Sequence, residues 1–296
     1  MPMNPDDGLI SASAATFTIL GAAGYVGAAL VAMLHSAGHR VHAVTRGSLP
    51  RLLETRRNAG HVIDCIGLTA DFRAHPDDTA EAHVGVTARC LAHLEFESFL
   101  FLSSTRVYAR AAATHEGASL PCSPTDPAEL YNLTKLAGEA LCLADPRPEV
   151  RVARVSNIYG PDLPADTFLG AVFQEGRETG AVLLRQARRS CKDYVSLADV
   201  TRLLPLIARY GRHRIYNLAA GVNTSHAAIA LLLRRRAGWH VAFSPGAPTV
   251  RFPPINIARI TEEFGAMLSN SSGGLATLVA HGQDIQCSPS MRAEVG

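Results

Sequence analysis

Residues 16–27 read Thr-Phe-Thr-Ile-Leu-Gly-Ala-Ala-Gly-Tyr-Val-Gly, and an apolar stretch follows them. This pattern predicts a buried strand, a glycine turn and a helix, in that order. Gly21 allows the tight turn, Gly24 lets the backbone approach a pyrophosphate, and Gly27 permits the helix to pack closely on the strand. The first amides of such a helix would face the anion. The alternative is an ordinary glycine loop. The candidate dinucleotide contacts in the turn are Gly21, Gly24, Tyr25, Val26 and Gly27.

Strand and helix signals alternate from this turn to about residue 155. Such alternation predicts parallel strands joined by crossover helices on both faces of one sheet. With 296 residues, of which 47% are hydrophobic, the chain can bury a sizeable core. The predicted fold class is therefore α/β, with a Rossmann-type doubly wound parallel sheet.

The second predicted strand, residues 40–44, ends in Thr45-Arg46-Gly47. Sites specific for NAD usually carry a carboxylate at this point, where it binds the adenosine ribose hydroxyls. No carboxylate is present here, and Arg46 could pair with a 2′-phosphate instead. The strand end therefore favours NADP over NAD, while a solvated arginine remains the alternative reading of Arg46.

Tyr131 and Lys135 are separated by about one helical turn, so both side chains project from the same helix face. A nearby ammonium favours the phenolate and so lowers the pKa of a tyrosine. The pair is therefore a candidate general acid/base. Taken alone, the spacing also occurs by chance in many helices.

The glycine turn, the hydroxyl run Ser103-Ser104-Thr105 and the Tyr131/Lys135 pair together resemble the short-chain dehydrogenase/reductase superfamily. The resemblance is to its extended branch, the NAD-dependent epimerase/dehydratase family, and runs from about Thr16 to about Gly265. It implies that Ser104, Tyr131 and Lys135 are catalytic and that Lys135 holds the nicotinamide ribose. Thr105 is a candidate substrate contact.

Two later segments resemble the extended branch as well. Residues 154–161 look like the segment that opens the substrate domain, which implies that Asn157 contacts a substrate diphosphate. Residues 192–200 look like a second family segment, with Lys192 in place of the usual arginine. Arg251, which follows these matches, is a third candidate substrate contact.

The sequence also departs from the family. Between Arg46 and the strand predicted at residues 61–66, too few residues remain for the usual helix and third strand. This departure puts the adenine pocket in doubt. After that strand, Gly67 can still let a cofactor pass close to the backbone. Thr105 and Arg106 occupy the positions of two acidic residues in the dehydratase members, which argues against a 4,6-dehydratase.

The resemblance implies a Rossmann domain at residues 14–155 that binds NAD or NADP, and a mainly substrate-binding region at 156–268. Residues 1–13 and 269–296 are expected to form weakly ordered tails. The expected reaction is hydride transfer to or from a nucleotide sugar, as an epimerase or as a keto-sugar reductase, and the sequence does not separate the two. Reduction of a non-sugar carbonyl in secondary metabolism and a non-catalytic NADP-sensing protein are the alternatives.

A net charge of +2 argues against nucleic acid as a partner. The six cysteines have neither paired nor metal-ligand spacing, which favours a reducing cytoplasm and no bound metal. No run approaches the roughly 18 apolar residues of a membrane span. The resemblance adds the expectation of a homodimer.

Overall fold

A parallel sheet forms the centre of the molecule. The computed structural model describes residues 14–55, 58–68, 72–265, 268–269 and 271–284. The sheet has six strands in the order β2-β1-β3-β4-β5-β9. These strands are β1 (Thr16–Leu20), β2 (Arg40–Val44), β3 (His61–Asp64), β4 (Ser98–Ser104), β5 (Val150–Val155) and β9 (Ile215–Leu218).

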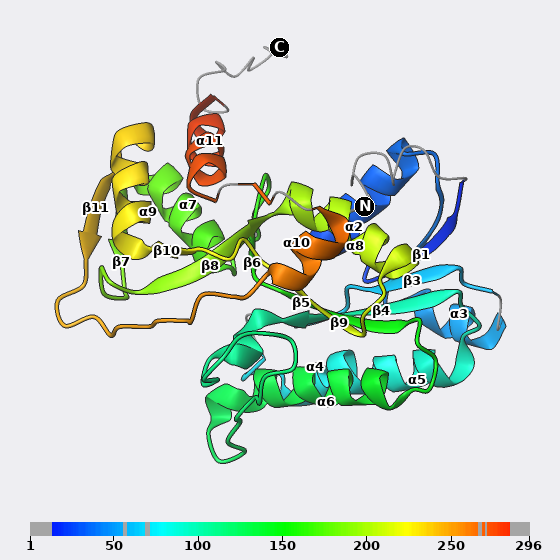
Figure 1. The fold of residues 1–296 in the computed structure, drawn as a ribbon. Helices are drawn as coiled ribbons and strands as arrows, with labels where there is room; N and C mark the ends of the chain where they lie inside the picture. The colour runs from blue at the N-terminus through cyan, green and yellow to red at the C-terminus, as the bar shows by residue number, and fades with distance from the viewer. Residues whose placement is uncertain (1–13, 56–57, 69–71, 266–267, 270, 285–296) are drawn as a thin grey trace, which may run out of the picture.

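Helices cover both faces of this sheet (Figure 1). One face carries α2 (Tyr25–Ser36), α8 (Leu197–Tyr210) and α10 (Ala258–Phe264), and the other carries α3 (Leu49–Thr55), α4 (Pro76–Ala80), α5 (Val86–His93) and α6 (Leu130–Ala144). Because successive side chains of a strand point to opposite faces, β4 contributes side chains to the hydrophobic cores on both faces of the sheet. Leu100 and Leu102 pack in one core, and Phe99 and Phe101 pack in the other. The predicted doubly wound α/β fold is confirmed.

The shortened third-strand region is visible in the topology. Among the described residues between β2 and β3, regular structure is limited to α3 and an isolated bridge at Asn58. The strand β2 is therefore the edge of the sheet, and β1 pairs with β2 on one side and with β3 on the other. The carboxyl ends of β1 and β3 form the topological switch point, where ligands bind in folds of this kind.

A smaller lobe extends the chain beyond β5. It contains a three-stranded sheet of β6 (Asn157–Tyr159), β8 (Cys191–Ser196) and β10 (Asn223–Ser225), and the parallel pair β7 (Ala181–Leu184) and β11 (His240–Phe243). Helices α7 (Phe168–Thr179) and α9 (His226–Leu232) complete it, together with a short π-helical turn at Leu233–Ala237. Since α8, β9 and α10 return to the large sheet, residues 156–268 contribute to both lobes, and the predicted domain division stays a prediction.

The end of the described chain is helical, where the sequence predicts a weakly ordered tail. Helix α11 spans Ser271–Asp284. Leu275 and Val279, four residues apart on one helix face, are buried in the core of the smaller lobe. Because most residues of this segment are small or polar, the sequence pattern did not indicate that Leu275 and Val279 form an apolar helix face. The other predicted tail segments, residues 1–13 and 285–296, lie outside the described residues.

A buried polar network fixes β4, β5 and β9 against α6. Glu139 of α6 accepts hydrogen bonds from Ser103 and from Arg154, whose Nη2 lies 2.6 Å from a carboxylate oxygen. Arg154 also donates to the Tyr108 hydroxyl at 2.7 Å, and that hydroxyl donates to Asn217 at 2.9 Å. Breaking a buried ion pair of this kind costs about 3–5 kcal/mol. The network therefore holds in place the two elements, β4 and α6, that carry the candidate catalytic residues.

Candidate active site

The glycine turn has the shape that the sequence predicts. Gly21 has a φ of +74°, and the Gly24 amide donates to the Gly21 carbonyl oxygen at 2.9 Å. A Cβ atom at Gly27 would lie 2.2 Å from that same oxygen, so no side chain fits there. Helix α2 begins at Tyr25, and Gly24 at its N-cap has no side chain to satisfy the first amides. The turn and the helix start therefore suit a pyrophosphate.

The flanking candidates lie around this turn. Val26 is half-buried, and the Tyr25 hydroxyl donates to the carbonyl oxygen of Pro161 at 2.9 Å, which links the turn to the smaller lobe. Burial, with a smaller effect of Asp162, raises the pKa of Tyr25 to about 12. Arg46 is exposed just beyond β2. Because Leu20 and Val44 are in register, Arg46 lies at the same sheet edge as the turn.

Ser104 and Tyr131 meet at the carboxyl end of β4. Ser104 is the last residue of that strand, and Tyr131 is the second residue of α6. Tyr131 is buried, and the Ser104 side chain lies close enough to act on the pKa of its phenol. Ser104 also accepts a hydrogen bond from the Arg106 amide at 3.2 Å. Thr105, the next candidate, is buried at the start of the same turn, a 3-10 helix over Thr105–Tyr108.

Lys135 lies deeper than its spacing from the tyrosine suggests. Its ammonium donates to the carbonyl oxygen of Leu102 at 2.8 Å. Burial lowers the pKa of Lys135 to about 8, and the nearby Asp64 carboxylate opposes that shift. The sequence predicts that Lys135 lowers the pKa of Tyr131. In the structure burial raises the pKa of Tyr131, partly opposed by the Ser104 hydrogen bond and then by the Arg106 charge.

Gly67 lies where the lysine and a histidine converge. A Cβ atom at Gly67 would lie 3.4 Å from Lys135 Nζ and 3.2 Å from His83 Nε2. His83 is fully buried, its Nδ1 is 2.9 Å from Thr134 Oγ1, and Nε2 has no hydrogen-bond partner among the described residues. Its ring meets that of Tyr131 edge-on, with centroids 5.4 Å apart. Burial, followed by the charge of Lys135, lowers the pKa of His83 to about 2.

Sequence reasoning missed His83 and Arg106 as site residues. His83 belongs to a π-helical turn at Glu81–Gly85, and no spacing rule predicts where such a turn aims a side chain. Arg106 entered the sequence analysis only as a departure from the dehydratases. Its guanidinium carbon lies 5.3 Å from the centre of the Tyr131 ring. The sequence signal that could have identified Arg106 as a site residue was its position directly after the hydroxyl run Ser103-Ser104-Thr105.

The candidate substrate contacts are spread along the smaller lobe. Asn157 is exposed on β6, and its side-chain amide donates to the carbonyl oxygen of Asp193 at 2.9 Å. Lys192 on β8 has its ammonium 5.4 Å from the ring centre of Phe168. Arg251 is exposed and forms a bridge with Cys191, next to Lys192 in the chain. The structure thus places Arg251 in a bridge beside β8, which carries Lys192, while the Asn157 amide makes a structural hydrogen bond.

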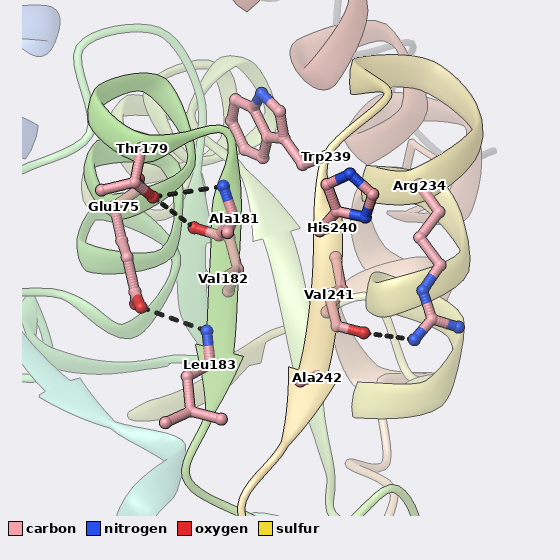
Figure 2. A pocket seen from close by; sticks show the side chains of 10 residues that line it. All are labelled: Glu175, Thr179, Ala181, Val182, Leu183, Arg234, Trp239, His240, Val241 and Ala242. Carbon is pink, nitrogen blue, oxygen red and sulfur yellow. Dashed lines mark hydrogen bonds between the residues drawn. The ribbon is translucent and has the colours of Figure 1, made fainter.

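Two pockets lie elsewhere in the smaller lobe. One, of about 540 Å³, lies over β7 and β11, where the Leu183 amide donates to Glu175 at 3.1 Å and Arg234 donates to the carbonyl oxygen of Val241 (Figure 2). These contacts cap both outer edges of the strand pair. The other, of about 1060 Å³, runs between α7, the start of α8 and α11. Neither pocket is lined by Ser104 or Tyr131, so pocket volume alone does not locate this site.

In the described part of the chain, no group of His, Cys, Asp and Glu side chains is arranged to hold a metal ion. None of the helices described there has the length and apolar character that crossing a membrane requires.

Comparison with solved structures shows the same fold in nucleotide-sugar enzymes. MoeE5, solved with UDP-glucose and NAD, has a TM-score of 0.78 and 22% identity, covering 92% of this chain and 100% of its own. TunA, an NAD-dependent NDP-hexosamine 5,6-dehydratase of tunicamycin biosynthesis, has a TM-score of 0.76 and 19% identity, over 93% of this chain and 98% of its own. The UDP-glucuronic acid 4-epimerase of Bacillus cereus, solved with UDP-glucuronic acid and NAD, has a TM-score of 0.74 and 17% identity, covering 91% of this chain and 99% of its own.

No curated protein sequence matches the chain significantly. Residues 17–219 match the model of the NAD dependent epimerase/dehydratase family. That match covers well over half of the chain, and it includes the glycine turn, β4 and the start of α6. The chain belongs to the NAD dependent epimerase/dehydratase family.

Proposed function

We propose that this protein uses a nicotinamide dinucleotide to oxidise or reduce a ring carbon of a nucleotide sugar, as an epimerase or a keto-sugar reductase. The observation that carries the proposal is the proximity of Ser104, at the end of β4, to Tyr131, at the start of α6, on the sheet edge where the glycine turn lies. The similar structures of MoeE5 and the Bacillus cereus epimerase hold UDP-glucose and UDP-glucuronic acid, respectively, beside NAD.

The residues of the chain fit the cofactor. Gly27 has no side chain, so α2 can begin close to the turn, and the start of α2 offers amide donors for the pyrophosphate. Gly67, which also has no side chain, leaves room beside Lys135. Lys135 would bind the nicotinamide ribose through its ammonium. When bound, the cofactor supplies the hydride acceptor or donor.

In the proposed reaction Tyr131 exchanges a proton with the reacting oxygen of the sugar, and Ser104 hydrogen-bonds that oxygen. Because burial raises the pKa of Tyr131, the free phenol is protonated at neutral pH. A protonated tyrosine can donate its proton to the carbonyl oxygen of a keto sugar, and the reduced cofactor would supply the hydride to the carbonyl carbon. Asn157, Lys192 and Arg251 are the proposed partners of the diphosphate, and Thr105 of the sugar.

We propose NADP over NAD because Arg46 lies exposed at the sheet edge beside the turn and no carboxylate follows β2. The truncated sheet edge at β2 also removes elements that would enclose the adenine, which favours a cofactor that exchanges in each turnover.

The experiment that tests the proposed function titrates the protein with NADH and NADPH by nicotinamide fluorescence and then adds nucleotide sugars and 4-keto nucleotide sugars. Stoichiometric oxidation of the cofactor by a keto sugar would identify a reductase, and interconversion of epimers with retained cofactor would identify an epimerase. If neither nucleotide binds, the proposal is wrong.

A further inference from the structure

A positive charge lies beside Tyr131, and the described residues give it no ion-pair partner. The guanidinium carbon of Arg106 is 5.3 Å from the centre of the Tyr131 ring and 5.1 Å from that of Phe72. Among the described residues its side chain donates one hydrogen bond, to the carbonyl oxygen of Ala128 at 3.1 Å. The Glu129 carboxylate, whose charge reaches Arg106, is itself 3.2 Å from the Nε atom of Arg110.

Two further cations lie close to this guanidinium. Arg73 lies over the same Phe72 ring, 4.7 Å from its centre. The ammonium of Lys192 lies near the rings of Phe168 and Phe252, and burial and then the Arg106 charge lower its pKa. Like charges held close together repel one another, and an anion bound between them relieves this repulsion. The surroundings of Tyr131 therefore suit a negatively charged ligand.

The position of Arg106 indicates which part of a ligand it meets. Its backbone amide donates to Ser104, and its side chain lies against Tyr131, so it is anchored to both groups that would contact the reacting oxygen. A ligand group reached from this position belongs to the sugar itself. Lys192, on β8 of the smaller lobe, would then bind the diphosphate rather than the sugar.

We propose that the sugar of the substrate carries a carboxylate next to its reacting carbon, as in a nucleotide-linked hexuronic acid, and that Arg106 binds this carboxylate. The planar guanidinium matches a carboxylate with two parallel hydrogen bonds, which a neutral hydroxymethyl group cannot provide. This inference rests on the proposed function, because it takes Tyr131 and Ser104 as the groups that contact the sugar.

The test compares UDP-glucuronic acid with UDP-glucose, which differ only in the carboxylate, by calorimetric titration of the protein saturated with its preferred nicotinamide cofactor. We expect the wild-type protein to bind the hexuronate about 30-fold more tightly, as a charge-assisted pair does. Arg106→Met should bring this ratio close to one, and Arg106→Lys should restore part of it. Arg235→Met, which removes an exposed arginine in the π-helical turn Leu233–Ala237 of the smaller lobe, should leave the ratio unchanged.

Equal binding of the two sugars by the wild-type protein would overturn the inference and leave the proposed function standing. A ratio that survives in Arg106→Met would overturn it too, because the carboxylate would then be bound by another group. If neither sugar binds although the cofactor does, the nucleotide-sugar function itself fails. Should Arg106→Met fail to fold, the wild-type ratio and Arg106→Lys still decide the matter.

Discussion

At the scale of single residues, the behaviour of Tyr131 depends on its surroundings more than on its spacing from Lys135. The spacing predicted that both residues share a helix face, and they do share α6. It could not predict that burial outweighs the neighbouring charges, because desolvation depends on residues far away in the sequence. Arg106 and His83 reach Tyr131 from two other elements, and only the folded chain brings them together.

Arg46 carries the residue-scale prediction on the cofactor. Arg46→Ala should weaken NADPH binding about 10-fold, because the 2′-phosphate loses a charge-assisted hydrogen bond, and should leave NADH binding nearly unchanged. Fluorescence titration with both nucleotides measures the change. Arg40→Ala, at the start of β2 and so away from the strand end that Arg46 follows, is the matched control and should affect neither nucleotide. An equal loss for the two nucleotides would show that Arg46 does not contact the 2′-phosphate.

At the scale of elements, the turn between β1 and α2 was the most predictable part of the site. Its geometry follows from local rules on glycine, and the structure reproduces them at Gly21 and Gly27. The π-helical turn that carries His83 was not predictable, because no local sequence pattern marks where such a turn interrupts a helix. Helix α11 escaped prediction for a related reason, since its few apolar residues matter only against the smaller lobe.

Gly27 supplies the prediction at this scale. A methyl group there would lie 2.2 Å from the Gly21 carbonyl oxygen, so Gly27→Ala should push α2 away from the turn. We expect nicotinamide nucleotide binding to weaken at least about 10-fold, because the amides of α2 no longer face the pyrophosphate. Gly273→Ala is the control, since its added methyl group meets no atom within 4 Å. Unchanged nucleotide affinity in Gly27→Ala would contradict a pyrophosphate site at this turn.

At the scale of the whole molecule, the sequence predicted both the sheet and its missing strand. The count of residues between Arg46 and His61 left no room for a third strand, and β2 is indeed the edge. The path of the chain after β5 was harder to foresee. Strand β9 and helices α8 and α10 return to the large sheet through contacts between distant segments, which local periodicity does not encode.

Buried histidines link the stability of both lobes to pH. His226, stacked on Phe168 in the smaller lobe, has its pKa lowered to about 4 by burial and then by Lys192. Below about pH 6.5, His226 therefore binds a proton in the unfolded chain but not in the folded chain, and the stability of the folded state falls as the pH drops. At about pH 5 this one group costs about 2 kcal/mol of unfolding free energy.

His226→Phe should therefore lose less stability than the wild-type protein between neutral pH and about pH 5, by about 2 kcal/mol in urea unfolding. His35→Phe, at an exposed position of α2, serves as the control and should follow the wild-type curve. Parallel curves for His226→Phe and the wild-type protein would show that His226 already binds its proton in the folded state.

The most direct test of the central claim is the turnover of Tyr131→Phe, measured together with its affinity for nicotinamide nucleotide. The substitution removes the hydroxyl that would exchange the proton and keeps the ring that packs against Phe72 and His83. We predict that kcat falls by about 10²–10⁴-fold, the usual contribution of a positioned acid or base, while nucleotide affinity changes less than about threefold. Turnover equal to that of the wild-type protein would show that Tyr131 is not the acid/base of this site.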